Sequence, residues 1–84
     1  MSYNITILRQ AQKELSEIHG QIYERIRDAI RSLSQNPQPS GCLKLVGREG
    51  WRIRISNYRV VYEIDDNNKS VTILNIGHRR DVYR

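Results

Sequence analysis

The stretch that decides the fold runs from Trp51 to Ile64 and reads WRIRISNYRVVYEI. Apolar residues take every second position in residues 51–55 and again in residues 60–64, with a short connection at residues 56–58 between them. Alternation with a period of two is typical of strands that have one apolar face. The pattern therefore predicts two β-strands joined by a tight turn.

The polar positions of this hairpin carry three arginines, Arg52, Arg54 and Arg59. If the apolar residues of both strands share one face of the sheet, the three arginines share the other, although a slip of one residue in the pairing would turn one strand over. Guanidinium groups on neighbouring strands repel each other unless an anion lies between them, and their planar fork matches the geometry of phosphate. The hairpin therefore predicts an anion site, with phosphate as the expected ligand.

The segments on either side of the hairpin predict an α/β fold of the α+β kind. Residues 2–8 alternate as a strand does, and residues 9–35 carry apolar residues at helical spacing, with a break at His19 and Gly20. Residues 43–45 predict a short strand, and residues 71–76 predict a strand that is apolar on both faces and central in its sheet. We expect an N-terminal strand, a two-helix hairpin and a mostly antiparallel four-strand sheet. The helices would pack on one face, leaving the arginines on an open face.

Length and charge narrow the class of protein. The chain has 84 residues and a net charge of +5, which predicts a single domain over residues 1–84 with an acidic partner. It has no apolar run long enough to span a membrane and no visible secretory signal, and its only cysteine, Cys42, cannot form an internal disulfide. These features predict a cytoplasmic protein that does not act at a membrane. No cluster has the spacing of metal ligands, so neither a metal nor another cofactor is expected.

Two stretches resemble a known family. YRVVY at residues 58–62 and GHRRDVYR at residues 77–84 are the most specific parts of a match that covers essentially the whole chain. They resemble the RelE/ParE superfamily of bacterial toxins, and its RelE branch more closely. The resemblance implies the toxin of a type II toxin–antitoxin system, an mRNA interferase that cuts the codon in the ribosomal A site. It also implies partners, namely a cognate antitoxin, the ribosome with its mRNA, and operator DNA reached through the antitoxin complex.

The resemblance also implies roles for individual residues. Relatives of the RelE type place basic residues at alternate positions of the third strand, an arginine after the tyrosine that opens the next strand, and an arginine and a tyrosine near the C-terminus. The expected catalytic residues are Arg54, Arg59, Arg79, Tyr83 and His78. From their charge alone, we expect four basic residues to bind the RNA backbone rather than to take part in the chemistry: Lys44, Arg48, Arg52 and Arg80. The third-strand positions are often lysine in the family and are arginine here, so no lysine stands there to transfer a proton.

The expected reaction is attack of the neighbouring 2′-hydroxyl on the phosphate, which needs a base, charge stabilisation and an acid. Arginine suits charge stabilisation because it binds two phosphate oxygens and stays charged. We therefore expect Arg59 and Arg79 on the scissile phosphate, with Arg54 in support or as the partner of the leaving group. Tyr83, whose pKa nearby arginines would lower, and His78, with an ordinary pKa of about 6.5, are rival candidates for the base.

Two other functions remain open on the sequence. A ParE-like protein of the same fold would inhibit DNA gyrase without cutting RNA, and an inactive relative would serve as a corepressor or binding module. A single arginine on a strand is most often solvated, His78 could simply cap a strand, and Tyr83 could simply pack. The basic residues taken together favour RNA cleavage.

Overall fold

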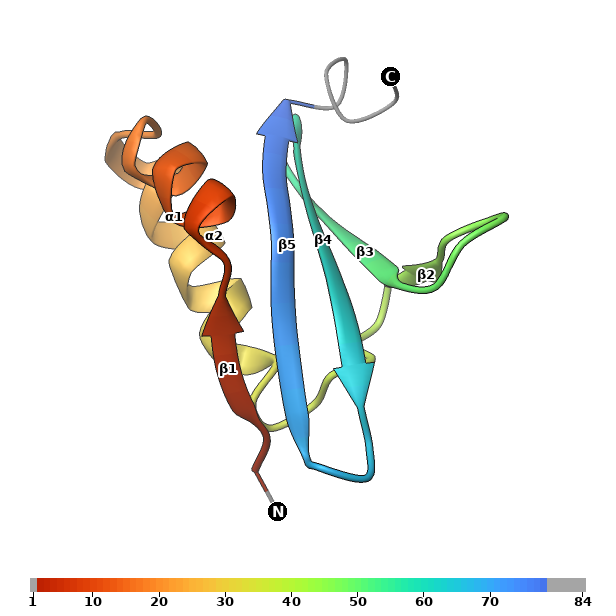
Figure 1. Ribbon diagram of the computed structural model, residues 1–84. Helices are drawn as coiled ribbons and strands as arrows, with labels where there is room; N and C mark the ends of the chain where they lie inside the picture. Colours follow the sequence, from red (N-terminus) through yellow and green to blue (C-terminus); the bar gives the residue numbers. More distant parts are fainter. Residues whose placement is uncertain (1, 79–84) are drawn as a thin grey trace.

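The computed structural model describes residues 2–78, so the predicted site residues Arg79, Arg80 and Tyr83 lie outside the described part of the chain. Figure 1 shows two helices lying together on one side of a sheet. The elements in chain order are β1 (Asn4–Ile7), α1 (Arg9–Ser16), α2 (Gly20–Ser32), β2 (Leu43–Lys44), β3 (Trp51–Ile55), β4 (Tyr58–Asp65) and β5 (Ser70–His78). Within residues 2–78, neither helix has the length and apolar character that crossing a membrane requires.

The sheet has the strand order β1-β5-β4-β3-β2. The four strands from β2 to β5 pair antiparallel with their neighbours, while β1 pairs parallel with β5. The predicted α+β fold is confirmed, and the N-terminal strand is the fifth strand of the same sheet. The prediction that residues 71–76 form a central strand is also confirmed, because β5 lies between β1 and β4 (Figure 1).

The register of the β3–β4 hairpin fixes which residues share a face. Trp51 lies opposite Tyr62, and Ile53 lies opposite Val60, so the apolar positions of both strands share the face that packs against the helices. The turn consists of residues 56 and 57 alone, and Ser56 adopts a φ of 56°. Two-residue hairpin turns require such a positive φ because their twist then matches that of the strands.

The core fills the space between the helices and this face. Its members with no exposed surface come from both helices, the segment just after α2, and strands β4 and β5: Ala11, Ile26, Leu33, Val60, Tyr62, Val71 and Ile73. The Tyr62 hydroxyl donates a hydrogen bond of 2.6 Å to the Pro37 carbonyl. A buried hydroxyl needs such a partner, and this bond ties the segment between α2 and β2 to the sheet.

Helix α1 completes the edge of β5 beyond the point where β1 ends. The Ile76 N–H donates a hydrogen bond of 2.7 Å to a carboxylate oxygen of Glu14, which thus takes the place of a strand partner. On its other edge β5 contains a bulge, because Asn75 lies opposite Val61 while Ile73 lies opposite Tyr62. Leu74 is therefore the extra residue, and it shifts the alternation of side chains along β5.

Candidate nucleic-acid interface

Arg54 and Arg59 lie directly opposite each other on β3 and β4. Since the hairpin closes with a hydrogen-bonded pair at Ile55 and Tyr58, the next pair along is a non-hydrogen-bonded one, in which the Cα atoms are about 4.5 Å apart. Like charges placed opposite each other on one face destabilise a sheet. The pair therefore presents two guanidinium-bearing side chains where a bound anion would relieve their repulsion.

Arg52 lies on the same face, opposite Val61. The predicted common face of Arg52, Arg54 and Arg59 is therefore confirmed by the register. The expectation of an open face was wrong at its centre, because Arg59 is 4% exposed and Val61 is 3% exposed. Both residues stand on β4, an interior strand with a neighbour on each side: Val61 lies opposite Arg52 and Asn75, and Arg59 lies opposite Arg54 and Gly77.

The same face changes its charge along β4. After Arg59 and Val61, the next two residues on this face are Glu63 and Asp65, both exposed. With Glu49 and Asp66 they line a hollow of about 580 Å³ at the far end of the sheet. Within the described residues, no three His, Cys, Asp or Glu side chains form a group that could hold a metal ion. Because of these charges along β4, a phosphate is attracted to the Arg59 end of this face and repelled from the Asp65 end.

The other predicted RNA-binding residues of the described chain do not join the three arginines. Lys44 lies opposite Trp51, which places it on the other face of the sheet. Arg48 is exposed in the loop between β2 and β3. Both remain candidates for contacts with a long RNA, but not with the same phosphate as Arg54 and Arg59.

His78 is also on the other face of the sheet. It lies opposite Tyr58, with the parity of Ile76 and Val60, and its ring meets the Tyr58 ring edge-on with centroids 5.7 Å apart. The structure therefore does not bring His78 together with Arg54 and Arg59, although it lies at the same end of the sheet. Its role in catalysis remains a prediction, as do those of Arg79, Arg80 and Tyr83.

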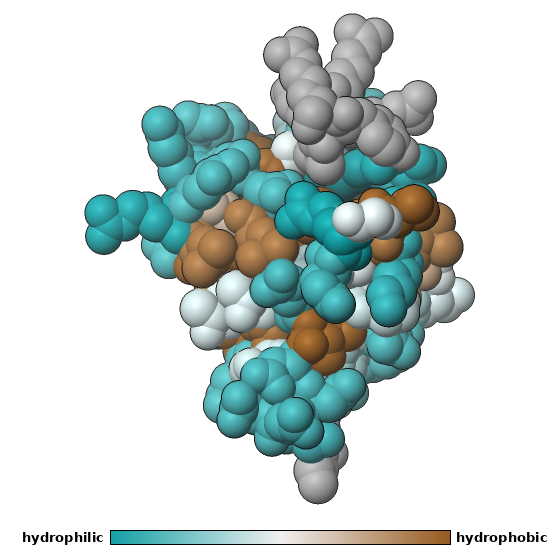
Figure 2. Space-filling model, turned by 45° about the vertical axis from the view of Figure 1, so that its right-hand side comes forward, coloured by the Kyte–Doolittle hydropathy of each residue, from teal (hydrophilic) through white to brown (hydrophobic). Residues whose placement is uncertain are grey.

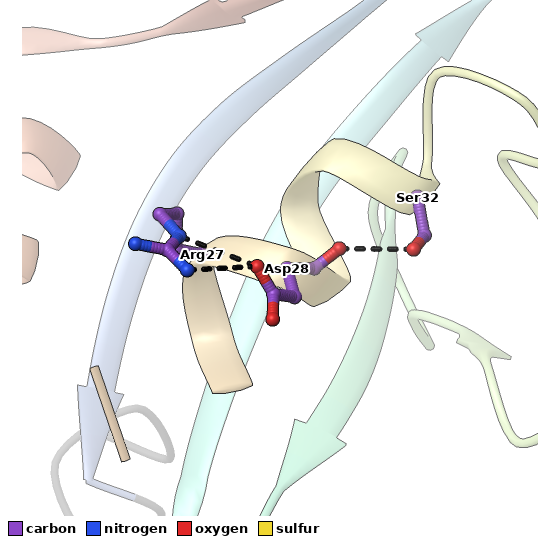
Figure 3. A network of polar contacts seen from close by, with 3 residues as sticks. All are labelled: Arg27, Asp28 and Ser32. Carbon is purple, nitrogen blue, oxygen red and sulfur yellow. Dashed lines mark hydrogen bonds and ion pairs between the residues drawn. The ribbon is translucent and has the colours of Figure 1, made fainter. Parts of the chain in front are cut away.

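The arginines of the helices are in a different environment. Figure 3 shows Arg27 on α2 beside Asp28, whose carboxylate oxygen is 3.1 Å from Nη2 of the guanidinium, while the Ser32 hydroxyl donates to the Asp28 carbonyl at 2.9 Å. The charge of Arg27 is neutralised locally by this neighbour. Arg27 therefore lies beside an opposite charge, whereas Arg54 and Arg59 lie opposite a like charge.

A second feature near the arginines was missed on the sequence. A shallow hollow of about 390 Å³ lies at the outer edge of β3, and it is lined by Ser40, Gly41, Leu43, Arg52, Ile53 and Arg54. The available signal was Leu43, an apolar residue that is 54% exposed on a two-residue strand. With only two residues in the strand, Leu43 and Lys44, the alternation was too short to show which face of the sheet Leu43 occupies.

Comparison with known proteins places this geometry in a family. The model of the "ParE toxin of type II toxin-antitoxin system, parDE" matches residues 5–83. The chain belongs to the RelE/ParE superfamily of toxins. This confirms the family predicted from the hairpin and the C-terminal stretch, and it makes the chain a toxin of type II toxin–antitoxin systems.

Individual relatives of this RelE/ParE toxin carry RelE names. Toxin RelG of Mycobacterium tuberculosis is 32% identical over 88 residues, which cover 100% of this chain and 99% of RelG. The RelE of an archaeal RelE–RelB complex from Pyrococcus horikoshii is 28% identical, with a TM-score of 0.83 over 94% of this chain and 97% of that one. A chain of the M. tuberculosis RelBE2 complex, 24% identical with a TM-score of 0.82 over 94% and 100%, shares the fold.

Proposed function

We propose that this toxin is a ribosome-dependent endoribonuclease that cleaves mRNA in the A site and thereby inhibits translation. The observation that carries the proposal is the direct cross-strand pair of Arg54 and Arg59, with Arg52 on the same face. A partly buried pair of guanidiniums is suited to a phosphodiester whose negative charge increases in the transition state. The similarity to relatives named RelG and RelE also supports a toxin of the RelE type.

The proposed reaction needs no metal. The 2′-oxygen forms a bond to phosphorus as a base takes its proton, and the bond from phosphorus to the 5′-oxygen breaks as an acid protonates that oxygen. The products are a 2′,3′-cyclic phosphate and a 5′-hydroxyl. Arg54 and Arg59, joined by Arg79, neutralise the pentacovalent phosphorane, but arginine keeps its protons and cannot act as the base.

The base is proposed to come from the C-terminal end. Tyr83 is favoured over His78, because the register places His78 on the face away from Arg54 and Arg59. Tyr83→Phe should then reduce cleavage, whereas His78→Gln should leave it within a few fold. The opposite result would transfer the role to His78 and would require the end of β5 to rearrange in the active complex.

The proposed partners follow from the same surface. Relatives from M. tuberculosis and P. horikoshii have been solved in complexes with RelB-type antitoxins. For this chain we propose a cognate antitoxin whose acidic segment covers the arginine face, and contact with operator DNA through that complex. A protein of this kind would act in the cytoplasm, where ribosomes and mRNA are found.

The experiment that tests the proposal is mapping of mRNA 5′ ends after a short pulse of expression. Wild type should produce new ends within translated codons, and Arg54→Ala should lose most of them, since Arg54 is exposed and its removal leaves the core intact. Arg25→Ala on the exposed surface of α2 removes the same charge elsewhere and should cut as wild type does. Full cleavage by Arg54→Ala, folded as judged by melting, would contradict the proposed role.

One observation favours a second candidate. The matching family model is named for ParE, and a ParE-like toxin would act on gyrase without cutting RNA. A gyrase inhibitor would arrest growth with intact mRNA and would block supercoiling by purified gyrase. Neither arrest nor cleavage would favour an inactive corepressor.

A further inference from the structure

The hollow beside β3 combines apolar and charged walls. The segment 40–43 supplies Leu43 and Gly41, and β3 supplies Arg52 and Arg54. Gly41 has a φ of 91°, and apart from its chain neighbours no atom lies within 4 Å of the position that a Cβ would take there, so the backbone can be approached closely. Figure 2 brings this side of the molecule forward and shows apolar patches set among hydrophilic side chains. A volume of about 390 Å³ lies at the lower end of the range for small-ligand sites.

The main chain of Arg54 faces this hollow. The Leu45 N–H donates to the Gly50 carbonyl at 2.9 Å, so the main-chain groups of Gly50 face the outer edge of β3. Main-chain groups of every second residue face the same edge of a strand, so those of Arg52 and Arg54 face this edge too. Arg52 pairs at that edge with Leu43, which is the first residue of β2, so β2 does not reach as far as Arg54. In the described part of the chain no backbone hydrogen bond joins Arg54 to residues 40–42, and the Cys42 N–H instead donates to the Pro39 carbonyl.

This edge therefore offers one donor and one acceptor side by side, the N–H and C=O of Arg54. An added peptide strand needs such pairs at several successive positions, but β3 ends one residue later, at Ile55. The edge of a nucleobase needs only a single donor–acceptor pair. The hollow adds to it an apolar wall from Leu43 and planar guanidinium surfaces, which stack on bases.

We propose that this hollow is a subsite for one nucleobase of a single-stranded RNA, next to the phosphate held by Arg54 and Arg59. The ligand class rests on the proposed function. The base would lie against Leu43 and Gly41, with its hydrogen-bonding edge toward the main chain of Arg54. Its own phosphate would then be close to the arginine face, because the side chain of Arg54 belongs to both.

The test uses the full-length toxin, free of antitoxin, and five-nucleotide oligoribonucleotides that each carry one abasic position. In fluorescence anisotropy at low salt, one abasic position should weaken binding by about tenfold relative to the intact oligonucleotide. Leu43→Ala should weaken binding of the intact oligonucleotide by at least about threefold and abolish the effect of that abasic position. Leu43 is 54% exposed, so its truncation leaves the core intact.

Val46→Ala is the matched control, because Val46 is an apolar residue just after β2, 98% exposed and outside the hollow. It should bind all oligonucleotides as wild type does. Equal binding of all abasic oligonucleotides, no binding at all, or unchanged abasic sensitivity in Leu43→Ala would overturn the subsite. So would a Leu43→Ala variant that binds RNA normally but loses antitoxin, since the hollow would then hold a peptide. Base-dependent binding without any mRNA cleavage would support the subsite while rejecting the proposed nuclease activity.

Discussion

Arg54 and Arg59 show at the residue scale how a binding site can oppose stability. They are direct cross-strand neighbours of the same charge, and Arg59 is 4% exposed, where solvent screens little. A sheet selected only for stability would place an opposite charge at one of these positions. The repulsion is therefore what a ligand anion would relieve.

We predict that Arg54→Ala raises the stability of the free protein while it lowers RNA cleavage. Removing a directly opposed like charge should increase the free energy of unfolding by about 0.2–1 kcal/mol, which raises Tm by a few degrees. The gain should shrink at high salt because ions screen the repulsion that is lost. Thermal melts of wild type, Arg54→Ala and Arg25→Ala at two salt concentrations measure it. A lower Tm for Arg54→Ala would show that the arginine stabilises the sheet.

Tyr62 has a purely structural role that can be tested separately. Its ring is fully buried, and its hydroxyl donates to the Pro37 carbonyl. Tyr62→Phe should lower the free energy of unfolding by about 1 kcal/mol, or Tm by about 4–8 °C, because the carbonyl loses its partner. Tyr3→Phe, which removes an exposed hydroxyl bonded to Asp66, is the comparison and should cost less.

The pKa of Tyr62 also predicts how the stability of the fold changes with pH in the alkaline range. Burial, followed by the nearby Cys42, raises the pKa of Tyr62 well above 10. A pKa that is higher in the folded than in the unfolded chain stabilises the fold fully below about pH 10, and this contribution is lost as the pH rises further. Chemical unfolding between pH 8 and 11 should show a steeper loss for wild type than for Tyr62→Phe. Equal slopes would mean that Tyr62 titrates alike in both states.

At the scale of elements, β5 depends on a helix for part of its edge. Glu14 of α1 accepts the Ile76 N–H at 2.7 Å where no strand continues beside β1. Glu14→Ala should lower the free energy of unfolding by about 1.5–3 kcal/mol, because the bond is charge-assisted and Ile76 is an interior strand residue. Amide exchange of Ile76 should accelerate more than that of Ile73, whose main chain pairs with β1. Glu17→Ala, at the exposed C-cap of α1, is the control and should change neither value by more than a few tenths of a kcal/mol.

The elements also show which parts of the structure could be predicted from the sequence. The β3–β4 hairpin was predictable because strict alternation and a two-residue turn fix both the register and the common face of the arginines. The parallel pairing of β1 with β5 joins residues 4 and 70, and no local pattern reports such a distant contact. The face of His78 was equally hidden, because β5 is apolar on both sides and the bulge at Leu74 shifts its alternation. The 4% exposure of Arg59 was not predictable either, because arginine is mostly exposed and no local pattern marks this one as buried.

At the scale of the whole molecule, charge is distributed unevenly on one face. The net charge of +5 would attract RNA from any direction, but β4 carries Arg59 at one end of this face and Asp65 at the other. Strands of RNA that run along β4 would meet the acidic end. We therefore expect bound RNA to cross the strands at the arginine end, over β3 and β4.

This arrangement predicts that RNA binding depends on where a charge lies rather than on the total. For single-stranded RNA, each phosphate contact contributes a slope of about −0.7 to the dependence of log K on log salt. Arg52→Ala and Arg54→Ala should each make the slope about 0.7 less steep, whereas Arg25→Ala, which lowers the net charge equally, should leave it unchanged. Titrations of one fluorescent oligoribonucleotide at several salt concentrations give the three slopes. Equal changes in all three variants would show that RNA is held by the diffuse field of the protein. A change confined to the β3 arginines would locate the phosphate contacts on the hairpin that decides the fold.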